Sequence, residues 1–164
     1  MKKIILLVLA LTSGVISSCS DNENDSGVLE VNLTQQEIAD LNFLREEEKL
    51  ARDVYLYSFN LYGLQIFKNI SNSEQMHMNS VLELLNKYNL KDPASEKIGE
   101  FNNADLQELY NNLTQKSSIS MIEALVVGNI IEDLDIKDIA LNEERTIKTD
   151  ILDVYGSLKC GSRN

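Results

Sequence analysis

The sequence predicts an all-α domain with four main helices and one short helix. Apolar residues recur at helical rather than alternating spacing along most of the chain after residue 33. The chain has one proline, Pro93, and only 7 glycines, so its segments run long without a helix breaker. A chain of 164 residues is also long enough to bury one real core. These observations favour a single helical bundle.

The first two helices form the first predicted hairpin. One is expected over residues 34–61, with Thr34 as its N-cap, Glu37 as the capping-box partner and Gly63 after its end. The other is expected over residues 64–88. Each carries an inward apolar stripe that acidic residues interrupt. The stripes comprise Leu41, Leu44, Glu48, Ala51, Tyr55 and Ser58 in the first helix, and Ile70, Glu74, His77, Val81, Leu84 and Tyr88 in the second.

A long connection then leads to a second predicted hairpin. It contains Pro93, Gly99 and a short helix over about residues 103–113, and is long enough to cross a bundle from end to end. Helices are expected over residues 120–136 and 142–159, with inward faces at Leu125, Gly128, Glu132 and Asp135, and at Ile147, Ile151, Val154 and Leu158. Two helical hairpins joined by a long crossover that carries a short helix form a ferritin-like four-helix bundle.

Four polar residues lie on stripes that should face the interior: Glu48, Glu74, His77 and Glu132. Burying an ionised carboxylate without a partner costs several kcal/mol, so something inside must neutralise them. The chain offers a basic partner such as Arg52, shared protons, or a divalent metal. Glu74 and His77 are three residues apart, so both reach one ion from one helix face. Carboxylate-bridged di-iron sites in bundle cores use this Glu-x-x-His pattern.

The pattern of Glu48, Ala51, Arg52 and Tyr55 resembles the first ligand helix of rubrerythrins. The segments REEEKLARDVY, IFKNISNSEQMHM, GEFNNADLQELYNNL and EALVVGNIIEDLDI, with the terminal GSRN, resemble a ferritin-like family of unknown function, domain of unknown function 2202. The resemblance covers nearly all of the chain after residue 33. It implies iron or another divalent metal, with a di-iron site in its full form. The implied ligands are Glu48, Glu74, His77 and Glu132, with Glu47 as an alternative to Glu48 and Asp135 as a supplement to Glu132.

The same resemblance implies that the fourth helix continues past GSRN into a segment that contains histidine, whereas the sequence stops at Asn164. Either the sequence is truncated or this member has lost a ligand, and both readings leave a one-metal or degenerate site open. Along the fourth helix, the inward positions after Leu158 should fall at about Gly161 or Ser162. Tyr55 and Tyr88 are expected either to pack in the core or to donate hydrogen bonds near a metal.

The N-terminus predicts export and lipid anchoring. Lys2 and Lys3 precede an apolar run over residues 4–11, which is too short to span a membrane as a helix. The residues before Cys19 resemble a bacterial lipobox, so residues 1–18 are expected to be a lipoprotein signal peptide and Cys19 the lipidated residue. Residues 19–33 form an acidic flexible tether that is similar to the surface-export signal of Bacteroidetes-type lipoproteins, and residues 34–164 form the ferritin-like domain. The predicted location is the outer membrane, with surface display left open.

The net charge of the chain limits the classes of partner that it is expected to bind. It has 26 acidic and 15 basic residues and a formal net charge of −11, so nucleic acid is not an expected partner. The membrane is expected as a partner through the lipid at Cys19, and a homodimer stays open. With Cys19 lipidated, Cys160 has no internal disulfide partner. A single histidine builds no Ser-His-Asp triad here, and the sequence has no glycine-rich phosphate loop.

Two functions follow from these observations. The first is an envelope-anchored, metal-binding ferritin-like protein that uses Fe(II) with oxygen or peroxide, as an oxidase, a peroxide scavenger or an iron binder. Whether it is an enzyme is left open, and if it is one, a di-iron oxidoreductase is expected. The second is a non-catalytic helical interaction module whose metal site is degenerate. Outside the cytosol, detoxification or sensing fits an iron protein better than bulk storage.

Overall fold

The computed structural model describes residues 32–162, and all the regular structure in this range is helical. This confirms the all-α class. The helices are α1 (Gln35–Tyr62), α2 (Gln65–Lys87), α3 (Ala104–Ser117), α4 (Met121–Glu143) and α5 (Thr149–Gly161).

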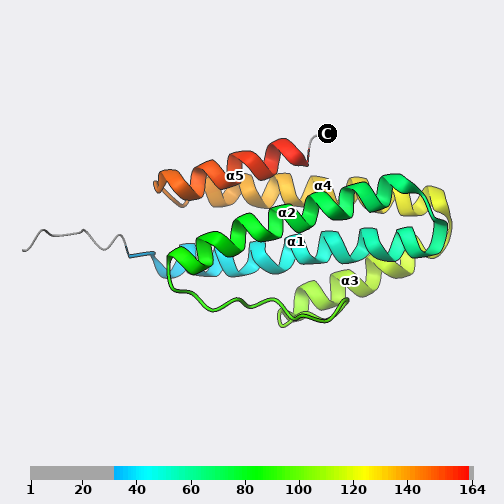
Figure 1. Ribbon diagram of the computed structural model, residues 1–164, viewed down its shortest axis with the longest axis horizontal. Coiled ribbons are helices and arrows are strands. Elements are labelled where there is room, and N and C mark those ends of the chain that lie inside the picture. The colour runs from blue at the N-terminus through cyan, green and yellow to red at the C-terminus, as the bar shows by residue number, and fades with distance from the viewer. Residues whose placement is uncertain (1–31, 163–164) are drawn as a thin grey trace, which may run out of the picture. The chain divides into compact units, whose positions relative to one another are not determined.

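Four of these helices, α1, α2, α4 and α5, lie side by side (Figure 1). A short turn joins α1 to α2, and another joins α4 to α5, so each pair runs antiparallel. The connection over residues 88–103 and α3 carry the chain back along the bundle, so α4 runs in the same direction as α2. Helix α1 packs against α2, α3 and α4, whereas α5 packs against α4 and α2.

The helix ends follow the local sequence. The Thr34 side chain accepts a hydrogen bond from the Glu37 backbone N–H, and the Glu37 carboxylate accepts one from the Thr34 N–H, as the capping box predicts. Gly63 ends α1 in the left-handed conformation, with φ of 66°, which glycine adopts without strain. Ser120 caps α4 by accepting from the Glu123 N–H. These predicted boundaries are confirmed.

The second hairpin differs from the prediction at two inward positions. Leu125 is 44% exposed, because Ala124, Val127 and Ile131 hold the inward apolar face of α4 one residue away from the predicted register. Ile147 is 94% exposed. It lies in a turn, because α4 continues to Glu143 rather than residue 136, and α5 begins at Thr149 rather than residue 142. The other predicted positions of α5, Ile151, Val154 and Leu158, are buried or half-buried.

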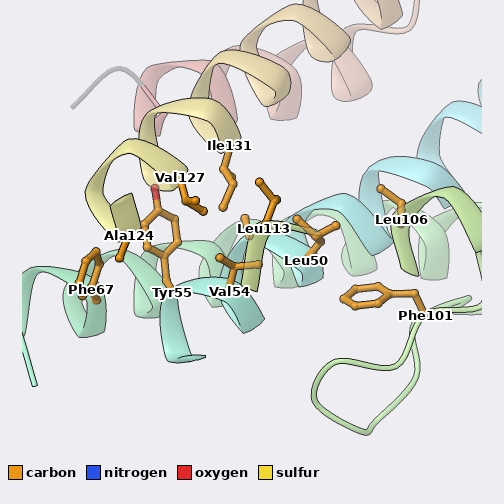
Figure 2. Packing of buried hydrophobic residues seen from close by; sticks show 11 residues of the cluster. Leu50, Val54, Tyr55, Phe67, Phe101, Leu106, Leu113, Ala124, Val127 and Ile131 are labelled. Atoms are coloured by element: carbon orange, nitrogen blue, oxygen red, sulfur yellow. The ribbon is translucent and has the colours of Figure 1, made fainter. Parts of the chain in front are cut away.

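The core consists of two apolar clusters. The first, which we call the α3 cluster, packs α3 onto α1 and α4 (Figure 2). The second, the α5 cluster, packs α5 onto α1, α2 and α4. Between the two clusters, most of the buried side chains of α1, α2 and α4 are polar, and several of them are acidic, so an acidic layer separates the clusters. The α3 cluster comprises Leu50, Ala51, Val54, Tyr55, Phe67, Phe101, Leu106, Leu113, Ala124, Val127 and Ile131, and the α5 cluster comprises Leu41, Leu44, Val81, Leu84, Leu85, Ile139, Ile151, Tyr155 and Leu158.

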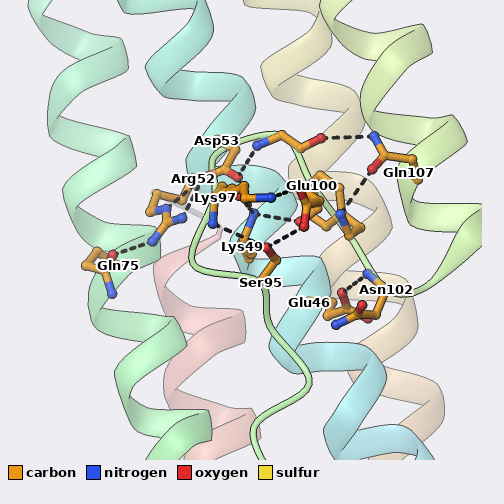
Figure 3. A network of polar contacts seen from close by, with 12 residues as sticks. Glu46, Lys49, Arg52, Asp53, Gln75, Ser95, Lys97, Glu100, Asn102 and Gln107 are labelled. Atoms are coloured by element: carbon orange, nitrogen blue, oxygen red, sulfur yellow. Dashed lines mark hydrogen bonds and ion pairs between the residues drawn. The ribbon is translucent and has the colours of Figure 1, made fainter.

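A polar stripe of α1 fixes the connection that precedes α3 (Figure 3). The Glu46 carboxylate accepts hydrogen bonds from the backbone N–H groups of Asn102 and Asn103, at 2.7 and 3.1 Å. One turn on, the Lys49 ammonium donates to Asp53 and to two backbone carbonyls of the connection. Asp53 in turn accepts from a backbone N–H of the connection. The stripe therefore holds the connection against α1 and positions the start of α3.

Two predictions about the N-terminus fall on undescribed residues. The signal peptide over residues 1–18 and the lipidated Cys19 lie outside the described range, as does nearly all of the tether. Among the helices within residues 32–162, none has the length and apolarity needed to cross a membrane.

Candidate metal centre

Three predicted ligands from α1 and α2 meet in the acidic layer. The Nδ1 atom of His77 lies 2.9 Å from Oε2 of Glu74 and 3.3 Å from Oε2 of Glu48. One ligand atom from each residue lies within 4.8 Å of the other two, which is compact enough for one metal ion to contact all three. All three side chains are buried. We call Glu48, Glu74 and His77 the triad.

The sequence produces this meeting through helical spacing. Glu74 and His77 are three residues apart on α2, so their side chains leave the same face of the helix. Glu48 is four residues after Leu44 and three before Ala51, both fully buried, so it faces the interior of α1. The predicted stripes therefore bring the three polar side chains together.

The close contacts within the triad shift the pKa values of His77 and Glu48. Burial lowers the pKa of His77, but its hydrogen bonds to the carboxylates of Glu48 and Glu74 outweigh this effect and raise the pKa to about 10. Burial raises the pKa of Glu48 to about 8, although the hydrogen bond from His77 opposes this shift. These shifts favour a charged His77 and a protonated Glu48 at neutral pH, with the two carboxyl groups of the triad around one imidazolium.

Several oxygens in the acidic layer have no hydrogen-bond partner within the described range. They are Oε1 of Glu48, Oε2 of Glu47, and both carboxylate oxygens of Asp135, which is only 1% exposed. Burial strongly raises the pKa of Asp135, and the charges of Glu48 and Glu47 raise it further. Buried polar atoms are nearly always paired, so these oxygens mark places where a ligand would be stabilised.

The fourth predicted ligand, Glu132, is held by a tyrosine. The Tyr55 hydroxyl donates to Oε1 of Glu132 at 2.6 Å, and Glu132 is half-buried on α4. Burial and the charge of Glu132 raise the pKa of Tyr55, so the hydroxyl remains a donor. An added Cβ at Gly128 would lie 3.1 Å from this hydroxyl, so the glycine makes room for it. Tyr88 lies elsewhere, where its hydroxyl donates to Asp150.

The C-terminal end of α5 approaches the triad from the side opposite to Nδ1 of His77. An added Cβ at Gly161 would come within 2.5 Å of Nε2 of His77, and Ser162 is buried next to it. The inward positions predicted at Gly161 or Ser162 are therefore confirmed. Within the described range, α5 adds no carboxylate or histidine to the triad.

A cavity of about 880 Å³ opens onto this centre between α2, α4 and the end of α5. Tyr55, Glu74 and Glu132 contribute its polar wall, whereas Phe67 and Ile70 are among its apolar residues. The cavity is large enough for water or another small molecule to reach the carboxylates.

Comparison with known proteins assigns the family. Residues 37–164 match the family described as uncharacterized protein domain (DUF2202). The chain belongs to this family. It is 50% identical over 133 residues to the uncharacterized protein MJ0754 of Methanocaldococcus jannaschii, a match that covers 80% of this chain and 72% of the relative. The crystal structure of the hypothetical protein MJ0754 from Methanococcus jannaschii superposes with a TM-score of 0.79 at 50% identity, covering 80% of this chain and 76% of that one.

Sequence reasoning missed part of the polar interior of this DUF2202 chain. Burial raises the pKa of Glu47 and the nearby charge of Asp138 raises it further, yet Asp138 was not among the candidate residues. The available signal was its spacing, because Asp138 is three residues after Asp135 and shares its helix face. Arg52, which was considered as a partner for the interior acids, instead pairs with Asp53 and donates to Gln75.

Replacing Tyr55 with phenylalanine is expected to reduce the free energy of unfolding by about 1–3 kcal/mol, because a partly buried carboxylate loses its hydroxyl donor. Urea denaturation monitored by circular dichroism measures the change. Tyr57→Phe is the matched control, since the Tyr57 hydroxyl pairs with Ser118 in a solvent-accessible position. Equal effects of the two substitutions would contradict a special role for the Tyr55–Glu132 bond.

Proposed function

We propose that this protein binds a divalent metal, with iron as the favoured ion, between Glu48, Glu74 and His77. The observation that carries the proposal is the buried triad itself, with ligand atoms within 4.8 Å of one another. Two carboxylates and an imidazole form a mixed oxygen and nitrogen donor set, which suits Fe(II), Mn(II) and Zn(II).

The charges around the triad support this fit. Glu47, Glu48, Glu74 and Glu132 all act electrostatically on the buried Asp135, and His77 is the histidine that faces them. A divalent ion would neutralise two of these negative charges and occupy the unpartnered Oε1 of Glu48. Glu132, which accepts a hydrogen bond from Tyr55, would be a further ligand.

The chemistry we propose is the oxidation of Fe(II) by oxygen or peroxide at the envelope, and iron bound here would supply the one-electron redox step. The residues of the chain would bind the ion and orient its surroundings. Glu48, Glu74 and His77 hold the ion, and Tyr55 orients Glu132 through its hydrogen bond. The 880 Å³ cavity next to Glu74 admits a molecule the size of oxygen or peroxide.

We further infer that the fold is a ferritin-like four-helix bundle. The supporting observations are two helical hairpins, a long connection between them that carries α3, and polar residues that project from α1, α2 and α4 into the interior. We also propose that lipid at Cys19 anchors the protein to the outer membrane, as the lipobox resemblance of the residues before Cys19 indicates.

Metal content tests the proposal directly. Full-length protein purified without chelator is expected to retain iron, manganese or zinc, as measured by elemental analysis. Adding Fe(II) anaerobically at about 100 times its dissociation constant should raise the stability by about 2.7 kcal/mol. Glu74→Gln and His77→Ala should abolish both effects, whereas Glu83→Gln, an exposed glutamate on the same helix, should preserve them. Wild-type protein without metal, and with no thermal shift from added metal, would refute the proposal.

A second candidate function is a non-catalytic helical module, and the protonated His77 favours it. Its hydrogen bonds to Glu48 and Glu74 already neutralise part of the buried charge without a metal. In that case the wild-type protein would bind no metal, and His77→Ala would still destabilise it, because two carboxylates would lose their cation. The metal analysis and the melting curve of this variant together separate the two functions.

A further inference from the structure

We propose that this protein forms a homodimer through an apolar surface at one end of the helices. The surface lies where α1 turns into α2 and α3 turns into α4, and it includes the outward face at the start of α4 (Figure 1). We call it the apolar end, and its large exposed side chains are Ile66, Ile119, Met121, Ile122, Leu125 and Val126. The contact requires no metal and is independent of the triad.

The six side chains of the apolar end lie close together. Residues 119–126 surround the first turns of α4, and Ile66, at the start of α2, lines the same 880 Å³ cavity as Leu125. The Tyr62 hydroxyl donates to the backbone carbonyl of Ser117 at 2.7 Å, which joins the end of α1 to the end of α3. Each of the six residues is at least 39% exposed. Together they expose several hundred Å² of apolar surface, the scale that marks an interaction site.

The first half of α4 is apolar on two sides. Its inward side belongs to the α3 cluster, and its outward side carries Ile122, Leu125 and Val126. A helix that is apolar all round is normally buried. In the second half of α4 the exposed residues include Asp133 and Lys137, as on an ordinary surface helix. The outward apolar side is therefore confined to the half of α4 that forms the apolar end.

Helix α5 leaves this half of α4 uncovered. It has 13 residues, against 23 in α4, and lies along the second half of α4 (Figure 1). Beyond its end at Gly161, the space between α2 and α4 is the 880 Å³ cavity, whose apolar walls include Ile66, Ile70 and Leu125. None of the described helices fills this groove, so it can accept apolar side chains from another molecule.

The distribution of charge favours a second copy of the chain as that molecule. The chain has a net charge of −11, so two copies repel each other wherever their acidic surfaces meet. Residues 57–71 and 116–131, which form the apolar end and its surroundings, contain only three charged residues, Lys68, Lys116 and Glu123. Lys116 and Glu123 pair with each other at 2.7 Å. Two apolar ends can therefore meet without repulsion between carboxylates.

The apolar end is also complementary to itself. Ile122 and Val126 are four residues apart and form a ridge along α4, and the groove between Ile66 and Leu125 lies beside this ridge. A twofold axis would place the ridge of each copy over the groove of the other, as in an isologous dimer. A stable interface buries about 800 Å² on each partner, which the six side chains and their polar rim can supply. The dimer would also cover part of the cavity that leads to Glu74.

A lipid surface is the other occupant that exposed apolar side chains can have. Surfaces that bind membranes combine apolar residues with clusters of lysine and arginine, which attract anionic lipid. At the apolar end, Lys68 is the only cation outside the pair of Lys116 and Glu123. The electrostatic attraction to lipid would be weak, so the second copy is the favoured occupant.

Sedimentation equilibrium of the full-length chain tests the dimer. A Cys19→Ser background in chelator excludes assembly through lipid or metal, and we expect this protein to be a dimer at micromolar concentration. Ile122→Asp should raise the dimer dissociation constant by at least about 100-fold, because it brings two carboxylates into the apolar contact. Ile147→Asp is the matched control and should leave the dimer unchanged. Ile147 is 94% exposed and lies in the turn between α4 and α5, at the opposite end of α4.

Circular dichroism should show that both variants fold, because each replaced isoleucine is exposed in the monomer. A monomeric Cys19→Ser protein would overturn the dimer, and so would a dimer that is equally strong in Ile122→Asp and Ile147→Asp. Either result leaves the triad proposal standing, because metal content is measured separately. Flotation with vesicles of anionic phospholipid tests the other occupant. A monomer that binds these vesicles, and loses this binding on Ile122→Asp, would overturn the dimer and assign the apolar end to the membrane.

Discussion

Replacing Lys49 with methionine is expected to lower the free energy of unfolding by about 3 kcal/mol, because a buried ion pair loses its cation. Lys49 is fully buried, and its ammonium lies 2.6 Å from Oδ2 of Asp53. It also donates to the carbonyls of Lys97 and Glu100, at 2.8 and 3.1 Å, and lies 4.2 Å from the centre of the Phe101 ring. The ammonium thus joins α1 to the connection that leads to α3.

Methionine retains most of the apolar volume of lysine, so the measured change reports mainly the lost charge and hydrogen bonds. Asp53 would keep its contacts with Arg52 and with the backbone N–H of Gly99. Two backbone carbonyls of the connection, however, would lose their donor away from solvent. We therefore expect the connection to loosen first, with faster amide hydrogen exchange in residues 97–103 than in α2.

The measurement is chemical denaturation of wild-type and variant protein, with hydrogen exchange to locate the change. Lys97→Met is the matched control, because Lys97 lies in the same network but its side chain is 78% exposed and its ammonium pairs with Glu100 at the surface. The control should change stability by less than about 0.5 kcal/mol. If Lys49→Met is equally mild, the network of Lys49 does not anchor the connection.

The fold could be predicted from the sequence largely because its signals are local. Thr34, Gly63 and Ser120 set helix ends through contacts with residues a few positions away. Helix α4 was harder, because it is apolar on several sides and two adjacent registers fit the same spacing. Leu125 and Ala124 are neighbours, and the packing against α1 and α3 decides which one is buried.

The candidate site was predictable for a similar reason. Glu48, Glu74 and His77 interrupt apolar stripes, and helical spacing alone turns them inward. The role of Lys49 was not predictable, because its partners at residues 97 and 100 are 48 and 51 positions away and both are backbone carbonyls. No local pattern shows such a contact. Asp138 was missed because the group that its charge affects, Glu47, lies on another helix.

Raising the pH from about 5.5 to about 8.5 is expected to lower the stability of the metal-free protein by several kcal/mol. The pKa of Glu48 rises from 4.5 to about 8 on folding through burial, so the folded state holds a proton that the unfolded chain has released. Burial opposes the shift of His77, but Glu48 and Glu74 raise its pKa from 6.5 to about 10. Both groups stabilise the folded state fully below their unfolded pKa values, and this contribution is lost as the pH rises.

Two aspartates affect the stability of the folded state at pH values below this range. Hydrogen bonds from Arg45 lower the pKa of Asp92 and those from Lys87 lower that of Asp150, although burial opposes both shifts. Their contribution is present above the ordinary pKa of aspartate and is lost as the pH falls further. The metal-free protein should therefore be most stable near pH 5, where the ion pairs of these aspartates are intact and the triad still holds its protons.

Thermal melting in chelator at a series of pH values measures the effect. Glu48→Gln should flatten the decline above pH 5, because the amide does not titrate, whereas the exposed Glu83→Gln should leave the decline unchanged. Metal should reverse the trend, because its ligands bind only after they lose their protons, so the thermal shift caused by Fe(II) should grow as the pH rises. A melting temperature that rises in chelator between about pH 6 and pH 8.5 would mean that the triad carboxylates are ionised and balanced by some other partner.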